Sequence, residues 1–120
     1  MRYYIKVCDF KGKEGRFMIQ HIVMFRFQET AQGRTKAENL EEAKRRMLAL
    51  KEEIPQIQGM EVRFAAQGSA PGNYDYILIS QFQSMEDLEI YQKHPAHVAF
   101  GNFVKELREP DGRACMDYQL

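Results

Sequence analysis

Apolar and polar residues alternate along residues 19–27, IQHIVMFRF, with the period of two that is typical of a β-strand. Residues 60–66 and residues 74–82 alternate in the same way, and the turn-forming run GSAPGN separates them. This spacing predicts three strands, of which the second and third form a hairpin. Residues 113–119, which follow the turn-like run EPDG, are predicted to form the last strand.

Two other stretches repeat apolar residues at helical spacing. Thr35 and Glu38 form a TxxE capping box ahead of the first, which we expect to extend from about residue 35 to residue 53. Ser84 is the expected N-cap of a second helical unit. Pro95 suits the first turn of a further helix, because its missing N–H has no partner to lose there. The second unit is therefore predicted to break in two just before Pro95.

The predicted order from residue 18 onward is βαββαβ, the split arrangement of a ferredoxin-like α+β domain with an antiparallel sheet. Helices cover one face of such a sheet, yet these strands carry apolar residues on both faces. We expect the uncovered face to pack against a second copy of the chain, which gives a two-fold homodimer. The expected interface residues are Ile22, Met24, Ile77 and Ile79.

Residues 1–17 lie outside this pattern. Their first part, RYYIKVCDF, alternates like a strand, and KGKEG follows it as a turn. They form either an added edge strand or an extension upstream of a start at Met18, and the sequence leaves both open. We take residues 18–120 as the domain.

Length and charge narrow the class of protein. The chain has 120 residues, which suits one domain with one core. Its 17 Lys and Arg equal its 17 Asp and Glu, so we expect no nucleic-acid partner and no membrane partner. With no long apolar segment and no signal-peptide pattern, a cytoplasmic location is expected. Cys8 and Cys115 are expected to be free thiols.

The string HPAHVAFG, residues 94–101, sets two histidines around a proline. Together with the strands IQHIVMFRF and NYDYILISQF, the segment EIPQIQGMEV and the closing MDY, it resembles the stress-responsive A/B barrel family, also called the Dabb domain. The resemblance covers about residues 18–119. It implies a ferredoxin-like protomer whose sheet pairs with that of a second copy into a dimeric α+β barrel, and no assigned reaction for most members.

One plant member of that family, olivetolic acid cyclase, cyclises a linear polyketide thioester by an aldol reaction. The resemblance puts its catalytic tyrosine and histidine at Tyr91 and His97, and its first-strand histidine at His21. A further pocket histidine of the cyclase falls on Tyr76, so the chain departs from the cyclase in the donor offered to a substrate.

An aldol reaction needs a base with a pKa near neutrality and a donor for the enolate oxygen. His97 suits the first role because histidine has a pKa of about 6.5, and the hydroxyl of Tyr91 suits the second. We expect both to serve an apolar pocket that takes a small organic carbonyl compound and needs no cofactor. The other expected pocket residues are His21, Tyr76, Phe25, Leu78 and Phe100.

Other interpretations stay open. The chain is otherwise a stress-associated structural dimer whose pocket is filled by its own side chains, or a cofactor-free monooxygenase. In the simpler interpretation His97 only bonds nearby backbone groups and Tyr91 only fills the core. His94 is expected at the start of the helix. No metal is expected, because HPAH offers two ligands and a site takes three or more.

Overall fold

The computed structural model describes residues 18–120, and the predictions for residues 1–17 lie outside them. The elements in chain order are β1 (Ile19–Phe27), β2 (Thr30–Ala31), β3 (Arg34–Thr35), α2 (Lys36–Glu53), β4 (Gly59–Phe64), β5 (Tyr76–Phe82), α3 (Met85–Lys93), α4 (Pro95–Lys105) and β6 (Arg108–Gln119). Apart from the short β2–β3 hairpin, this is the predicted order βαββαβ, with the second helical unit broken between α3 and α4.

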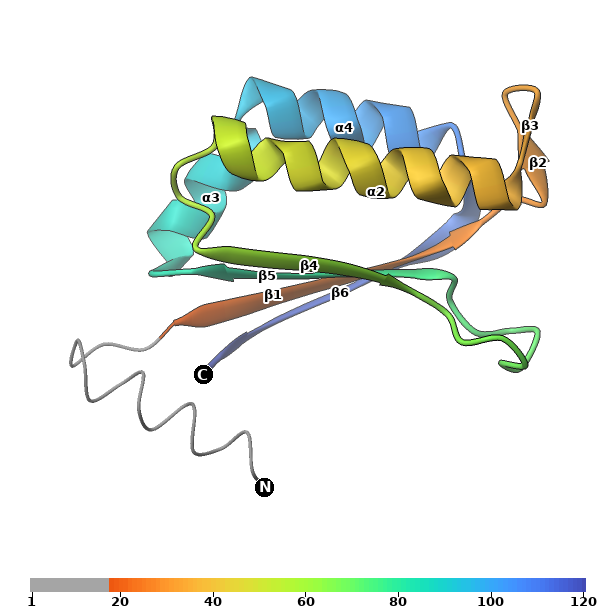
Figure 1. The fold of residues 1–120 in the computed structure, drawn as a ribbon. Coiled ribbons are helices and arrows are strands. Elements are labelled where there is room, and N and C mark those ends of the chain that lie inside the picture. The colour runs from red at the N-terminus through yellow and green to blue at the C-terminus, as the bar shows by residue number, and fades with distance from the viewer. Residues whose placement is uncertain (1–17) are drawn as a thin grey trace.

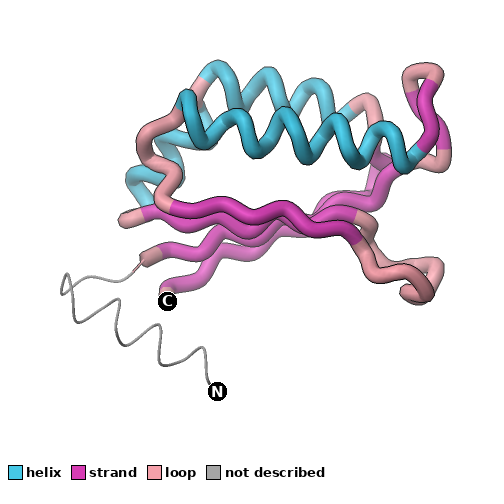
Figure 2. The backbone as a smooth tube through the Cα atoms, in the orientation of Figure 1, coloured by secondary structure: helices cyan, strands magenta, loops and turns pink. Residues whose placement is uncertain are grey.

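The four long strands form an antiparallel sheet in the order β4-β5-β1-β6. Helices α2 and α4 lie along one face of it and α3 lies near one end (Figure 1). The backbone trace shows two layers, helices over sheet, with no described helix on the opposite face (Figure 2). The ferredoxin-like α+β fold predicted from the sequence is confirmed. None of the described helices is long and apolar enough to cross a membrane.

The two faces of the sheet differ as the alternation predicts. Along β1 and β5 every second residue from His21 and Tyr76 onward is buried under the helices, while the residues between them are partly exposed. On the uncovered face Ile22 pairs with Ile79 on one side and with Met116 on the other. The uncovered residues of the central strands include Ile22, Met24, Ile77 and Ile79. Their burial against a second copy stays a prediction.

Each long helix begins where a capping residue is available. Thr35 accepts from the backbone N–H of Glu38, and the Glu38 side chain accepts in return from that of Thr35, which completes the predicted capping box. Ser84 caps α3 through the N–H of Asp87. At the start of α4, Nδ1 of His94 accepts from the N–H of Ala96 at 3.0 Å. The predicted role of His94 at the helix start is thereby confirmed.

The last strand begins earlier than predicted, because residues 109–112, EPDG, belong to the strand and do not form a turn before it. β6 begins at Arg108, and its register against β1 shifts between Phe25 and Phe27, which absorbs these residues as a bulge. A Cβ atom at Gly112 would lie 2.6 Å from the carbonyl oxygen of Arg26. Glycine therefore lets the two strands approach closely at the bulge.

The hairpin of β2 and β3 was not predicted. It turns through Gln32 and Gly33, whose φ angles of 54° and 75° are both positive. Such a two-residue turn matches the twist of the strands and favours glycine.

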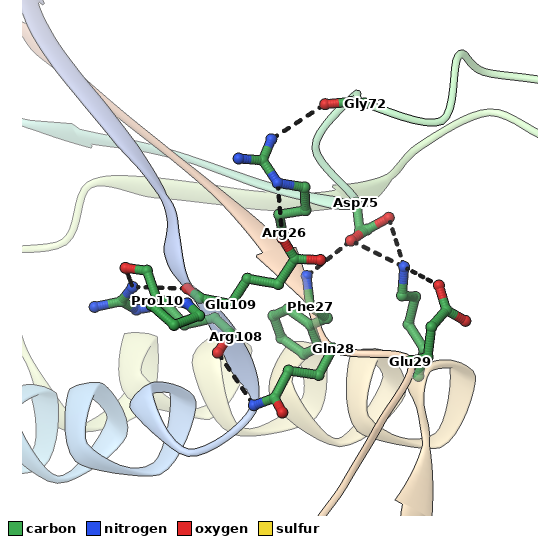
Figure 3. A network of polar contacts seen from close by, with 10 residues as sticks. Arg26, Phe27, Gln28, Glu29, Gly72, Asp75, Arg108, Glu109 and Pro110 are labelled. Atoms are coloured by element: carbon green, nitrogen blue, oxygen red, sulfur yellow. Dashed lines mark hydrogen bonds and ion pairs between the residues drawn. The ribbon is translucent and has the colours of Figure 1, made fainter.

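Polar contacts fix the corner where α4 passes into β6 (Figure 3). Nε2 of Gln28 donates to the carbonyls of Glu106 and Arg108, each at 3.2 Å. Nε of Arg26 donates to Glu109 at 3.2 Å. Next to it, a carboxylate oxygen of Asp75 accepts from the N–H of Phe27 at 2.8 Å. The start of β6 is thus tied to the end of β1.

Candidate functional site

A cavity of about 140 Å³ lies between the helices and the sheet. Its lining is formed by His21, Val23, Phe25 and Leu78 of the sheet, Met47 of α2, Gln92 of α3, His97, Phe100, Gly101, Val104 and Lys105 of α4, and Arg108 and Arg113 of β6. Space therefore exists beside His97, as a binding site requires. Among the predicted site residues, the cavity brings together His97, His21, Phe25, Leu78 and Phe100, but neither Tyr91 nor Tyr76. The roles of all of them stay predictions.

His97 lies in the first turns of α4 and reaches back to the end of α3. Its Nδ1 lies 3.1 Å from the carbonyl oxygen of Gln92. Because a carbonyl only accepts, Nδ1 carries the hydrogen, and in the neutral ring the lone pair is on Nε2. Burial lowers the pKa of His97 below its usual value, and the nearby His21 and Arg113 lower it further, against an opposing effect of the Gln92 carbonyl. The imidazole is therefore neutral at pH 7.

His21 lies near the start of β1, directly opposite Asp117 of β6. Its Nδ1 donates to a carboxylate oxygen of Asp117 at 2.5 Å, and its side chain is buried. The ring meets Tyr91 edge-on, with centroids 6.0 Å apart. The carboxylate thereby fixes the orientation of an imidazole that lines the cavity.

Tyr91 contacts both imidazoles without lining the cavity. Its ring centroid lies 4.4 Å from that of His97, and the residue is fully buried. Its hydroxyl donates to the sulfur of Met47 at 3.9 Å, and a thioether is a weak acceptor. Burial raises the pKa of Tyr91 well above its usual value, so the hydroxyl keeps its hydrogen. The hydroxyl of Tyr91 is thus the donor of a weak hydrogen bond. The residue contacts side chains that line the cavity but does not line it itself.

Tyr76 lies in the aromatic core instead of the cavity lining. Its ring packs against Phe25, Phe27 and Phe64, and its hydroxyl donates to the carbonyl oxygen of Ala43 at 3.3 Å. Burial raises the pKa of Tyr76 far above its usual value. Its position on β5 under α2 explains the difference, because the helix backbone offers its hydroxyl an acceptor away from the cavity.

One group of described residues has the donor types of a metal site. The ligand atoms of His21, Cys115 and Asp117 all lie within 4.8 Å of one another. No local sequence pattern indicates this trio, because β6 supplies two of its members through pairing with β1. Nδ1 of His21 is already bonded to Asp117, and the positive Arg113 lines the adjacent cavity. The arrangement is a hydrogen-bonded His–Asp pair next to a thiol, and HPAH takes no part in it.

Comparison with models of known protein families shows which family the chain belongs to. The family model described as the Stress responsive A/B Barrel Domain (Dabb) matches residues 19–120. The chain belongs to the Dabb family. No protein with a curated description matches this Dabb chain.

Solved structures show the same fold. A dimeric protein of unknown function with a ferredoxin-like fold from Bacteroides fragilis is 32% identical to the Dabb chain, with a TM-score of 0.72, and the match covers 86% of this chain and 96% of that one. A dimeric ferredoxin-like protein of unknown function from Thermobifida fusca is 24% identical, with a TM-score of 0.72 and coverage of 88% and 92%. A hydroxynitrile lyase from Passiflora edulis is 14% identical, with a TM-score of 0.68 and coverage of 86% and 93%.

The cavity of the Dabb chain has a basic margin that the sequence analysis did not predict. Lys105, Arg108 and Arg113 all contribute to its lining, and no Asp or Glu of residues 18–120 does. The end of α4 and the two parts of β6 meet there because β6 pairs with β1. The whole chain has equal numbers of basic and acidic residues, so its net charge gives no sign of this local excess of basic residues.

Proposed function

We propose that this Dabb protein binds a small organic carbonyl compound in the cavity and removes a proton next to the carbonyl, with His97 as general base and no cofactor. The observation that carries the proposal is the hydrogen bond from Nδ1 of His97 to the carbonyl of Gln92. It leaves Nε2 as the basic nitrogen of a neutral ring that lines a cavity. Because the pKa of His97 is lowered, the ring is mainly unprotonated at pH 7, as a general base must be.

The same proposal gives Tyr91 the role of donor to the enolate oxygen. Its hydroxyl is protonated, and within the described part of the chain its hydrogen-bond partner is the thioether of Met47. Because a methionine side chain is flexible, its displacement by a ligand would let the hydroxyl reach an oxygen in the cavity. A stronger hydrogen bond to the enolate oxygen than to the carbonyl would lower the barrier.

We also propose that the protein is a homodimer joined through the uncovered face of the sheet. Met116 and Tyr118 are 65% and 38% exposed in the single chain, and they extend the apolar surface around Ile22 and Ile79. An apolar face of this kind is typical of an interface. The similar proteins from Bacteroides fragilis and Thermobifida fusca are described as dimeric. The hydroxynitrile lyase indicates that the fold is compatible with catalysis.

Deuterium exchange into acetophenone tests the proposed chemistry. The wild-type protein in D₂O should replace the methyl protons of acetophenone with deuterium faster than buffer does, as followed by proton NMR. His97→Gln should lower the rate to that of buffer, because an amide is not a base.

His94→Asn is the matched control, since asparagine also caps a helix and His94 does not line the cavity. It should exchange acetophenone at the wild-type rate. Equal rates for wild type and His97→Gln, or no exchange and no binding by an intact wild-type dimer, would contradict the proposal. An intact wild-type dimer that neither binds acetophenone nor exchanges its protons would favour a structural dimer without catalysis.

A further inference from the structure

We propose that the ligand of this cavity is a small carboxylate, whose apolar body lies in the cavity and whose anionic group is held by Arg108 and Arg113. This inference rests on the proposed function, because it names the class of compound that the cavity binds.

The margin of the cavity carries positive charge without matching negative charge. Among the described residues that line it, three are basic and none is acidic, and the carboxylate of Asp117 next to it is bonded to His21. Within residues 18–120, the ion pairs of the structure involve other basic groups, and Lys105, Arg108 and Arg113 take part in none of them. The nearest acidic neighbour in sequence to Arg108 is Glu109, which pairs with Arg26 instead (Figure 3). An anion would supply the missing charge.

Arg108 is fixed in place without being neutralised. One of its terminal nitrogens donates to the carbonyl oxygens of Glu109 and Pro110, at 3.1 and 3.0 Å (Figure 3). These acceptors carry no net charge, so the guanidinium keeps its own. Its other N–H groups, which bond to none of residues 18–120, can bind a carboxylate in the planar, two-point manner that arginine favours.

Arg113 brings the second guanidinium to the same cavity. It lies on β6 directly opposite Phe25, which lines the cavity from β1. Its charge is also one cause of the lowered pKa of His97, so its field reaches the proposed base. Lys105 has a simpler explanation, since a cation in the last turn of α4 offsets the helix dipole. The two arginines therefore carry the inference.

The apolar space limits the rest of the ligand. The cavity of about 140 Å³ has walls that include Val23, Leu78 and Phe100. An apolar cavity of about 150 Å³ in another protein holds one benzene molecule. A single aromatic ring or a short branched chain fits such a space. The expected ligand is thus an aromatic or short-chain carboxylate.

Benzoate and its neutral analogue benzamide separate the charge from the shape. Both are titrated into the full-length protein, and binding is measured by calorimetry and by the NMR signals of the His97 ring. Benzoate should bind at least about tenfold more tightly than benzamide, because hydrogen bonds to charged groups are stronger than neutral ones. Added salt should weaken benzoate binding and leave benzamide binding unchanged.

Charge-removing variants locate the effect. Arg108→Gln and Arg113→Gln should each weaken benzoate about tenfold and leave benzamide within twofold of wild type, which also reports that the cavity is intact. Arg45→Gln, on an exposed part of α2 away from this cavity, is the matched control and should bind both compounds as wild type does.

The outcomes distinguish the two proposals. Equal binding of benzoate and benzamide to wild type, with shifts at His97, would overturn the carboxylate inference and leave the proposed binding function standing. An equal loss of benzoate affinity in Arg45→Gln would overturn it as well, because the effect would then be one of overall charge. Binding of neither compound would overturn both proposals.

Discussion

Replacing Gly112 with alanine should destabilise the protein, because the bulge in β6 has no room for a side chain. The added Cβ would lie 2.6 Å from the carbonyl oxygen of Arg26, 3.0 Å from the Cβ of Arg26 and 3.1 Å from the carbonyl oxygen of Glu109. Both oxygens belong to the backbone. The contact with Arg26 is relieved only when β6 moves away from β1, and the contact with Glu109 only when the bulge within β6 changes shape.

The expected size of the effect follows from two opposing contributions. Forcing an extra carbon into a packed site typically costs about 1–3 kcal/mol. Restricting the unfolded chain by replacing glycine stabilises by about 0.4–1 kcal/mol. The free energy of unfolding should therefore fall by about 1.3 kcal/mol when the middle of each range is taken. Movement of the bulge should also shift Arg108 and weaken benzoate binding.

Urea unfolding measures this change, with every variant at one protomer concentration because the stability of a dimer depends on concentration. Gly101→Ala is the control, since nothing lies within 4 Å of its added carbon in the middle of α4. That variant should gain up to about 1 kcal/mol, because alanine favours a helix more than glycine does. A Gly112→Ala protein as stable as wild type would refute the close approach of the strands.

Three further predictions concern Met47 in the cavity wall, the capping box at the start of α2 and the ionisation of His97. Met47→Ala should lower the free energy of unfolding by about 2–5 kcal/mol in the same assay, because Met47 is 1% exposed, and a loss below 1 kcal/mol would contradict its place in the core. Thr35→Ala should cost about 0.5–2 kcal/mol through loss of the capping box, whereas no loss would mean that the cap is dispensable. The acetophenone exchange rate, corrected for that of buffer, should rise with pH to a plateau with a midpoint below 6.5, since burial lowers the pKa of His97, and a midpoint above 6.5 would exclude it as the base.

The ionisation of His97 also predicts how stability varies with acid. Its folded pKa lies below the unfolded value of about 6.5, so the unfolded chain binds the proton first as pH falls. The contribution of His97 to stability is therefore fully present above pH 6.5 and declines below it. Urea unfolding of wild type and His97→Gln measures this effect: as the pH falls through 6.5, the free energy of unfolding of wild type should decrease relative to that of His97→Gln.

Local patterns were enough to predict the parts of the fold that depend on local physics. The alternation in β1 decided which face each residue takes, and the capping box of Thr35 marked the start of α2. The beginning of β6 was missed because EPDG has the composition of a turn, whereas its place in the sheet depends on long-range contacts with Arg26 of β1 and Gln28 of the loop that follows it.

The residues of the candidate site also include some that local patterns predict and others that they do not. Residues on predicted faces, such as His21 and Phe25, line the cavity as their periodicity suggests. Tyr76 shares their face but lies in the core, because alternation gives the side of a sheet and not the position under a particular helix. Arg108 and Arg113 reach the cavity through strand order and a bulge, which no local pattern encodes.

The protonation of the His97 ring tests the central claim most directly. A long-range ¹H–¹⁵N spectrum at pH 7 assigns which nitrogen carries hydrogen, and the account predicts hydrogen on Nδ1, a bare Nε2, and a shift of the Nε2 signal when acetophenone is added. A ring with hydrogen on Nε2, or on both nitrogens, would contradict the claim that His97 is a base ready to act in the cavity.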